Sequence, residues 1–236
     1  MTLFSGFPEY TQFRPLFDQT PGKPPITGED VYALQTGLTG CGVPCGPSDG
    51  ILGPMTGKAI WDFQTQQGLV RDGRAGPATN RQLVELLCVV PNGKYRLPTL
   101  LLFGQISHEA SLYPGRYSPA RSDGSYDAGI AQRNTEHTPP EVGFDTPASI
   151  SALAKNTRDH YNLFANIPGR RRWMLAAGAW NAPAYACLIA YQELVPIIGQ
   201  AAAAAQIPAS KRARSIGETA RAKFEAYMAD VTKMMP

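Results

Sequence analysis

The sequence contains few of the residues that build disulfide frameworks and metal sites. It has four cysteines and three histidines in 236 residues. Cys41 and Cys45 are close together in a Gly/Pro-rich segment, where a local disulfide is one option and free thiols are the other. Cys88 and Cys187 have no cysteine near them in the sequence, so we expect buried, unreactive thiols. Because the histidines follow no metal-ligand spacing, we expect neither a metal ion nor another cofactor.

The sequence also lacks a strong excess of charge of either sign. Its net charge at neutral pH is +3, and no basic stripe alternates with aromatic residues, which argues against nucleic acid as a partner. Residues 1–94 contain 7 Lys and Arg against 8 Asp and Glu, whereas residues 95–236 contain 15 against 11. The mildly basic second part suits an anionic polymer, although charge alone identifies no partner.

Long hydrophobic segments are absent as well. The longest apolar run, from Leu97 to Ile106, is shorter than the roughly 20 residues that a transmembrane helix needs, so we expect no stable membrane insertion. The first 19 residues lack the basic start and the continuous apolar segment of a secretory signal. We therefore expect the protein to stay in the cytoplasm of the cell that makes it until another agent releases it.

A near-repeat organises residues 26–90. The segments Asp49 to Thr56 (DGILGPMT) and Asp72 to Thr79 (DGRAGPAT) share an Asp-Gly pair suited to a tight turn, a second glycine, and a proline that can begin a helix. Apolar residues at helical spacing accompany them. The pattern predicts three short helices, at roughly Glu29–Leu38, Pro54–Gln67 and Pro77–Leu87.

This near-repeat resembles the three-helix peptidoglycan-binding module of cell-wall hydrolases. The elements that match the family pattern are Leu34-Gln35, Asp49 to Thr56, Ala59-Ile60, Phe63-Gln64, Gly68-Leu69 and Asp72-Gly73. The segment Cys41 to Pro47 is an insertion relative to the shorter form of that pattern. The resemblance implies a peptidoglycan-binding domain over residues 26–90, with bacterial peptidoglycan as the partner.

A second informative stretch begins where the apolar run ends. The run from Leu97 to Ile106 predicts a buried helix, and Glu109 lies at its end. Desolvation at such a place would raise the pKa of the Glu109 carboxyl, so that it could hold a proton near neutral pH. Asp127 follows in a polar, Gly/Ser-rich segment that predicts a hairpin or loop. One carboxyl in an apolar setting and one in a wet setting form the pair that glycoside cleavage uses.

The same stretch resembles two kinds of lysozyme. The segment SDGSYDAGIAQRN (122–134) is similar to the β-hairpin of chicken-type lysozymes. HEAS (108–111), the hairpin segment and AGAWNAP (177–183) are together similar to goose-type lysozymes and lytic transglycosylases. The resemblance implies a glutamate and an aspartate as catalytic residues, with an aromatic–Asn pair that stacks on a sugar and bonds its N-acetyl group. The candidate residues are Glu109 and Asp127 for catalysis, and Ser125, Gln132, Trp180 and Asn181 for substrate binding.

The match to the lysozyme patterns is incomplete, and structural roles are an alternative. Trp180 stands where the family has Tyr, and Pro183 stands where it has Gly. In the alternative interpretation Trp180 is a core residue and Asn181 caps a helix. Glu109 is then a surface residue at a helix end, and Asp127 only forms a turn.

The remaining segments are predicted mainly as helices. Residues 1–25 are Pro-rich with scattered aromatics, and we expect an extended arm over the folded body, with a disordered tail as the alternative. Cys88–Arg96 carries a Pro-Asn-Gly turn signal and predicts a connector, and Thr135–Thr146 predicts a loop. Further helices are expected at Pro147–Phe164, Trp173–Ala179, Ala184–Gln206 with a break near Pro196, and Ser210–Met235.

The last of these helices has an apolar stripe and a charged face. We expect the stripe to pack on the catalytic domain, and loosening of an anionic outer membrane is the alternative. The stripe consists of Ile216, Ala220, Phe224, Tyr227, Val231 and Met234.

Together these patterns predict a mainly α protein with a three-helix peptidoglycan-binding module and a lysozyme-like α+β domain that contains a small β-hairpin. The expected divisions are an arm (1–25), the binding domain (26–90) and the catalytic domain (95–236). The plan resembles bacteriophage endolysins, which implies a monomeric glycoside hydrolase that cleaves the β-1,4 bond between N-acetylmuramic acid and N-acetylglucosamine after release from the host cytoplasm. The alternatives are a lytic transglycosylase that uses Glu109 alone, a chitinase-like endolysin, and a non-catalytic wall-binding virion protein.

Overall fold

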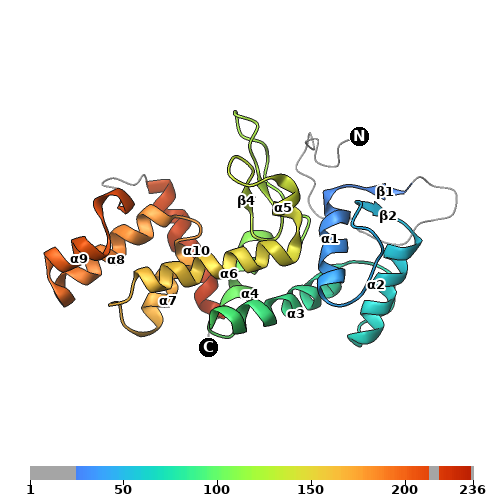
Figure 1. Ribbon diagram of the computed structural model, residues 1–236, viewed down its shortest axis with the longest axis horizontal. Coiled ribbons are helices and arrows are strands. Elements are labelled where there is room, and N and C mark those ends of the chain that lie inside the picture. Colours follow the sequence, from blue (N-terminus) through green and yellow to red (C-terminus); the bar gives the residue numbers. More distant parts are fainter. Residues whose placement is uncertain (1–24, 213–217, 235–236) are drawn as a thin grey trace. The chain divides into compact units, whose positions relative to one another are not determined.

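The computed structural model describes residues 25–212 and 218–234. This part of the chain is mainly helical, with ten α-helices, one short 3-10 helix and two two-stranded sheets. Figure 1 shows the order of these elements along the chain. The expected fold class, mainly α with a small hairpin, is confirmed. The expected N-terminal arm lies outside the described residues except for residue 25, and no described helix has the length and apolarity to cross a membrane.

Contacts within the chain group it into two compact units. Among the described residues, the first unit contains 25–90 together with Glu109–Ser151, and the second contains Pro91–His108 together with 152–212 and 218–234. The expected binding domain and the expected hairpin therefore belong to the same unit. The domain limits expected from the sequence stay a prediction.

The first unit begins with the three helices that the sequence predicts. Pro54 and Pro77 occupy the first positions of the second and third helices, where a missing backbone N–H costs nothing. The elements are β1 (Ile26–Thr27), α1 (Glu29–Gly40), β2 (Ile51–Leu52), α2 (Pro54–Gln66) and α3 (Pro77–Tyr95). The strands β1 and β2 pair antiparallel, with Ile26 opposite Leu52 and Thr27 opposite Ile51.

A buried glutamine of α1 holds the first Asp-Gly turn. The Gln35 amide nitrogen Nε2 donates to Asp49 Oδ1 at 3.0 Å and to Thr56 Oγ1 at 3.0 Å. It also lies 3.1 Å from the Ile51 carbonyl oxygen, while Gln35 Oε1 accepts from the Gly50 N–H at 2.8 Å. The side chain thus binds donors and acceptors of the turn and of the start of α2, and we call this arrangement a glutamine bracket.

The second Asp-Gly turn has the same bracket, made by Gln64 of α2. Gln64 Nε2 donates to Asp72 Oδ1 at 2.7 Å, to the Arg74 carbonyl at 3.0 Å and to Thr79 Oγ1 at 3.2 Å. Its Oε1 accepts from the Gly73 N–H at 3.0 Å. The Arg74 backbone N–H and the Gln64 amide lower the pKa of the Asp72 carboxyl. The repeat in the sequence is therefore a repeat of the same hydrogen bonds.

The third helix is longer than the sequence suggests, and the expected turn at Pro91-Asn92-Gly93 is wrong. α3 runs through Pro91 to Tyr95. A proline removes one helical hydrogen bond and crowds the preceding turn, but it does not have to end a helix. Pro91 is buried, and the helix closes after it with a hydrogen bond from the Leu97 N–H to the Asn92 carbonyl at 3.0 Å.

The rest of the first unit contains the expected hairpin and a helix that was not expected. β3 (Asp127–Ala128) and β4 (Arg133–Asn134) pair antiparallel, with Asp127 opposite Asn134. The segment 135–146, predicted as loop, includes α5 (Pro140–Phe144), so this prediction is wrong in part. Pro140 sits at the first turn of α5, where its missing backbone N–H costs no helical hydrogen bond.

α1 of the expected binding domain packs against the hairpin and α5. Ala33, Ala128 and Phe144 form one buried cluster. Thr146 adds two hydrogen bonds, from its N–H to Thr36 Oγ1 at 3.1 Å and from its Oγ1 to the Ala33 carbonyl at 2.8 Å. Apolar burial and hydrogen bonds therefore join these segments directly.

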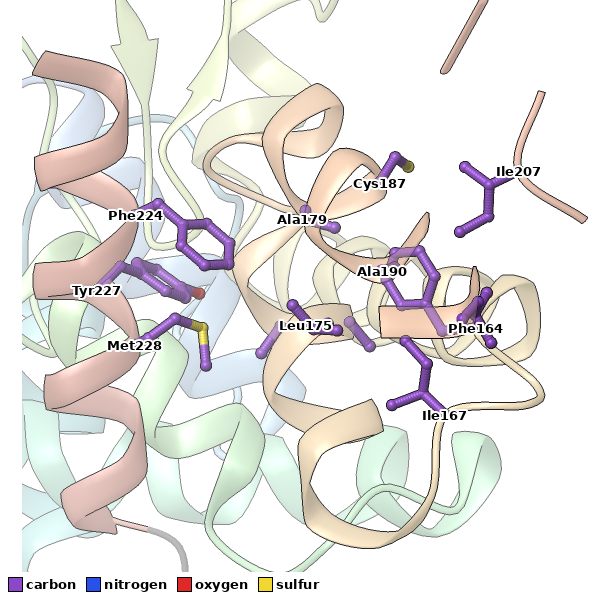
Figure 2. Packing of buried hydrophobic residues seen from close by; sticks show 14 of the residues in the cluster. Phe164, Ile167, Leu175, Ala179, Cys187, Ala190, Ile207, Phe224, Tyr227 and Met228 are labelled. Carbon is purple, nitrogen blue, oxygen red and sulfur yellow. The ribbon is translucent and has the colours of Figure 1, made fainter. Parts of the chain in front are cut away.

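The second unit is helical and has its own core. It contains most of α4 and α6, together with the helices that follow. Figure 2 shows Phe224, Tyr227 and Met228 of the last helix directed toward Leu175. The helices are α4 (Leu101–Ala110), α6 (Thr146–Leu163), α7 (Gly169–Gly178), α8 (Pro183–Ile198), α9 (Gln200–Gln206), the 3-10 helix η1 (Ala209–Lys211) and α10 (Glu218–Met234).

α10 packs through the apolar stripe that the sequence predicts. Phe224, Tyr227 and Val231 are at most 3% exposed. Gly178 at the end of α7 permits the close approach, because a Cβ there would collide with the Phe224 ring. These three residues of the stripe thus pack within the unit; Ile216 and the side chains of Ala220 and Met234 lie outside what the structure describes.

The expected break at Pro196 is three residues too early. α8 continues through Pro196 to Ile198. The chain turns at Gly199, whose φ of 83° is a conformation that favours glycine. α9 then begins at Gln200.

Candidate active site

Glu109 lies in the last turn of α4, as the sequence predicts. The helix begins at Leu101 rather than Leu97, because Leu100 has a left-handed backbone conformation with φ of 67°. Leu101, Leu102 and Ile106 are fully buried. Glu109 itself is half-buried, and its Oε1 atom is inaccessible to solvent. A carboxyl at the boundary between a buried helix and the surface has the placement that a general acid needs.

The backbone reverses sharply after Glu109. Ser111 and Leu112 have φ values of 51° and 63°, a region that residues with a side chain rarely adopt. The reversal is held by a hydrogen bond from the Tyr113 N–H to the Ala110 carbonyl at 2.9 Å. Strained backbone of this kind concentrates at functional sites, which supports the end of α4 as the candidate site.

Within the second unit, side chains of α6 and α10 hold α4. The fully buried Gln105 donates through Nε2 to the Tyr227 hydroxyl at 3.1 Å, and its Oε1 accepts from Thr157 Oγ1 at 3.1 Å. His108 lies edge-on to the Tyr227 ring, and its Nδ1 is 3.1 Å from Asp230 Oδ2. We call these five residues the α4 brace. Sequence reasoning missed it, although a glutamine inside the longest apolar run was the available signal.

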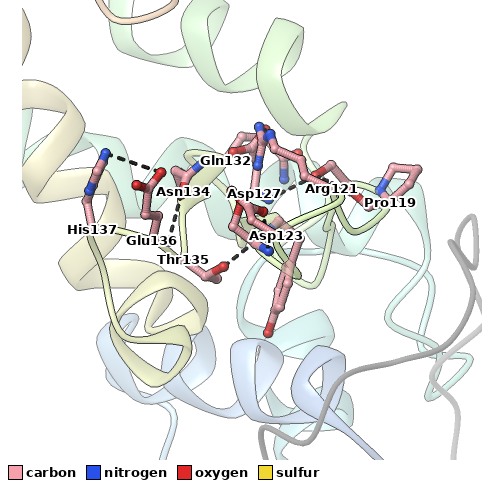
Figure 3. Close-up of polar contacts among 12 residues, drawn as sticks. Pro119, Arg121, Asp123, Asp127, Gln132, Asn134, Thr135, Glu136 and His137 are labelled. Atoms are coloured by element: carbon pink, nitrogen blue, oxygen red, sulfur yellow. Dashed lines mark hydrogen bonds and ion pairs between the residues drawn. The ribbon is translucent and has the colours of Figure 1, made fainter.

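Asp127 lies on β3, and an arginine holds its carboxylate. Arg121 Nη2 is 2.7 Å from Asp127 Oδ2, a pair that Figure 3 shows beside the hairpin. The Asp127 N–H donates to Ser118 Oγ at 2.8 Å, and its carbonyl accepts from the Ser118 N–H at 2.9 Å. The side chain keeps 26% of its surface exposed. Asp127 therefore ties the hairpin to the preceding loop and still presents carboxylate surface to solvent.

Gln132 shapes the loop of the hairpin. It has a φ of 49°, and its Nε2 donates to the carbonyls of Gly129 at 2.8 Å and Arg116 at 3.1 Å. Its amide hydrogens are thus engaged within the loop, and the assignment of Gln132 to substrate binding stays a prediction. Gly129 has φ of 73°, and a Cβ there would collide with the Gly143 carbonyl of α5, so only glycine fits.

Ser125 is the most deeply buried of the predicted substrate-binding residues in the first unit. It is 8% exposed, and its N–H donates to Asp123 Oδ1 at 2.8 Å in a tight turn. Its carbonyl accepts from the Arg121 N–H at 2.7 Å. These contacts favour a role in shaping the turn that carries Arg121.

Trp180 and Asn181 belong to the second unit, between α7 and α8. Trp180 is half-buried and Asn181 is exposed. Ala179 caps α7 and Ala182 precedes α8 without a side-chain cap bond, so Asn181 is not a capping residue of either helix. The assignment of both residues to substrate binding stays a prediction.

The cysteines are free thiols in the described part of the chain. Burial raises the pKa of the Cys41 thiol to about 11, and burial with a smaller effect of Glu85 raises that of Cys88 to about 12. Cys45 is buried in the binding domain, and its Sγ donates a hydrogen bond to the Gln35 carbonyl at 3.4 Å. Among the described residues, no group of three or more His, Cys, Asp or Glu side chains has the arrangement of a metal site.

Comparison with known proteins identifies one part of the chain. Residues 27–83 match the family described as "Putative peptidoglycan binding domain". A stretch of 69 residues is 39% identical to the N-acetylmuramoyl-L-alanine amidase CwlM of Mycobacterium tuberculosis (strain ATCC 25618 / H37Rv). This similarity covers 29% of the present chain and 17% of the amidase. The chain thus contains a domain of the peptidoglycan-binding family, and the family match covers none of the candidate catalytic residues.

Proposed function

We propose that this protein degrades bacterial peptidoglycan by cleaving its glycan strand. The observation that carries the proposal is the combination of a peptidoglycan-binding domain and a helix-end glutamate in one compact unit. The amidase that shares sequence with part of the chain is named for a muramoyl–alanine bond, so it supports a cell-wall enzyme and leaves the bond open.

In the proposed reaction, Glu109 is the general acid. Its carboxyl protonates the oxygen of the β-1,4 bond as the bond to C1 of the muramic ring breaks, and the resulting carboxylate then takes a proton from water. Asp127 stabilises the positive charge at C1, attacks it, or positions the water. Arg121 at 2.7 Å fixes the Asp127 carboxylate against the hairpin, which would reduce the reorganisation needed during the reaction.

A second candidate is a lytic transglycosylase, in which the same ion pair has only a structural role. If Arg121 and Ser118 engage Asp127 only to build the hairpin, Glu109 acts alone. The muramic C6 hydroxyl then attacks C1, Glu109 takes the hydroxyl proton, and no water is consumed. The product is a 1,6-anhydromuramic end, lighter by one water than a hydrolytic end.

Mass spectrometry of purified sacculi after digestion by the full chain tests the proposal. Reducing muramic ends identify a hydrolase, and 1,6-anhydro ends identify a transglycosylase. Stem peptides released from intact glycan would show an amidase and would overturn the proposed bond. Absence of any soluble product from permeabilised cells and sacculi would show a binding protein instead.

A further inference from the structure

Because the two glutamine brackets repeat the same hydrogen bonds, residues at the same distance from Gln35 and from Gln64 occupy equivalent positions in the two repeats. Tyr32 precedes Gln35 by three residues on α1, and Trp61 precedes Gln64 by three residues on α2. Residues three apart on a helix lie on neighbouring parts of one face. The fold therefore places an aromatic side chain at the same position of each repeat.

In the first repeat, the aromatic side chain at this position packs against another segment of the chain. Tyr32 packs on the cluster of Ala33, Ala128 and Phe144, so it faces the hairpin and α5. Burial, with Asp145 nearby, raises the pKa of its hydroxyl. The aromatic side chain of the first repeat is thus covered by another segment of the same chain.

In the second repeat, the equivalent residue remains open to solvent. Trp61 is 38% exposed, so part of its indole is accessible to a ligand. Gly73 lies against its indole, because a Cβ at that position would collide with Trp61 Nε1. The Arg71 guanidinium carbon lies 5.1 Å from the centre of the ring. The indole therefore has the Asp72-Gly73 turn against its Nε1 edge and the Arg71 guanidinium over its ring.

The chemistry of this surface fits a glycan strand that carries carboxylates. An indole offers a flat apolar face to the C–H surface of a pyranose. A guanidinium offers a planar pair of donors to a carboxylate, such as those of the peptides attached to muramic acid. Arg71 lies on the turn next to the indole and is exposed.

We propose that Trp61 and Arg71 form the glycan contact of the binding domain, with Trp61 stacked on a sugar and Arg71 on a peptide carboxylate. This inference rests on the proposed function in taking peptidoglycan as the partner. It goes further by naming the surface and by giving the second repeat the binding role while the first repeat serves packing.

Binding of the full chain to insoluble sacculi tests the inference. The sacculi are sedimented after incubation in the cold, and the bound fraction is measured as a function of sacculus concentration. Trp61→Ala should weaken binding about tenfold, as expected for the loss of a central Trp anchor. Trp61→Phe should retain most of the affinity. Arg71→Ala should weaken binding about threefold at low salt and less at high salt, because exposed ion pairs are screened.

Met55→Ala is the matched control. Met55 is on the same helix and is 62% exposed, and its removal should leave binding unchanged. Thermal unfolding of each variant shows whether the domain remains folded. If wild-type protein binds sacculi and folded Trp61→Ala binds equally well, the inference fails and the proposed function stands. If wild-type protein does not bind sacculi, the assignment of peptidoglycan as the partner fails first.

Discussion

The binding domain and the helix that carries Glu109 are stabilised over very different distances in the sequence. The brackets of Gln35 and Gln64 reach partners at most 21 residues away. In the α4 brace, Gln105 and His108 each reach a partner 122 residues away on α10. The binding domain is therefore specified locally, whereas the candidate acid depends on the far end of the chain for its support. This difference explains why the turns of the binding domain can be predicted from the sequence, whereas the distant partners that hold the Glu109 helix cannot.

The largest effect is expected at the candidate acid. Glu109→Gln keeps the shape of the side chain and removes the proton, so lysis of permeabilised cells should fall at least about a hundredfold. Sacculus binding and thermal unfolding should stay close to wild type, because the substitution preserves the size and shape of the side chain and Glu109 lies outside the residues that match the binding family. Glu136→Gln is the matched control, since Glu136 has a side chain that is 61% exposed. Retention of more than about a tenth of the wild-type rate would remove Glu109 from its role.

A smaller effect is expected from breaking the α4 brace. Gln105→Ala leaves Tyr227 and Thr157 without their buried partner, so the free energy of unfolding should fall by about 2–4 kcal/mol. Hydrogen exchange should rise in both α4 and α10, although the two helices are far apart in sequence. Lytic activity should fall as well, because α4 positions Glu109.

Gln64→Ala provides the local counterpart to Gln105→Ala. It removes a bracket of similar size, yet faster exchange should be confined to the turn at residues 72–79. Gln66→Ala, an exposed position on the same helix, should change neither exchange nor stability. Exchange that spreads from Gln64→Ala into α4 and α10 would contradict the contrast between local and distant support.

The smallest effect concerns pH. Burial lowers the pKa of His160 on α6, whose Nδ1 lies 3.0 Å from the Asn156 carbonyl. Below its ordinary pKa of about 6.5 the unfolded chain binds more protons than the folded one, so stability should fall as the pH drops toward 5. In denaturant unfolding, His160→Gln should reduce this slope, whereas His137→Gln, with a 76% exposed side chain, should leave it unchanged. An identical slope in all three proteins would show that other groups cause the acid sensitivity.

The sequence predicted the parts of the fold that follow from local chemistry. Pro54 and Pro77 begin helices, and the Asp-Gly turns lie where the repeat places them, because both features need only a few neighbouring residues. Pro91 and Pro196 misled the prediction, since tertiary packing kept both helices intact across them. The place of Glu109 at a helix end was predictable from one apolar run.

The partners of the candidate site residues were not predictable in the same way. Asp127 and Arg121 are only six residues apart, but their pairing depends on how the loop folds back on the hairpin. The sequence predicts that Gln132 meets substrate, which stays a prediction, but it gave no sign that the Gln132 amide nitrogen holds the carbonyls of Arg116 and Gly129. The α4 brace depends on contacts of α4 with α6 and α10. A single sequence does not show which residues of distant helices will face one another.

The packing of α1 on the hairpin limits how this protein could be re-engineered. A chimera made by replacing residues 26–90 with another wall-targeting module would strip the cover from Ala128 and Phe144 and leave Thr146 without its bonds to Ala33 and Thr36. The chimera would then expose apolar surface beside the candidate catalytic hairpin, even if the new module and the remaining chain each folded on their own. A tolerated exchange would have to retain α1, or supply a helix with a small residue and a hydroxyl in the places of Ala33 and Thr36.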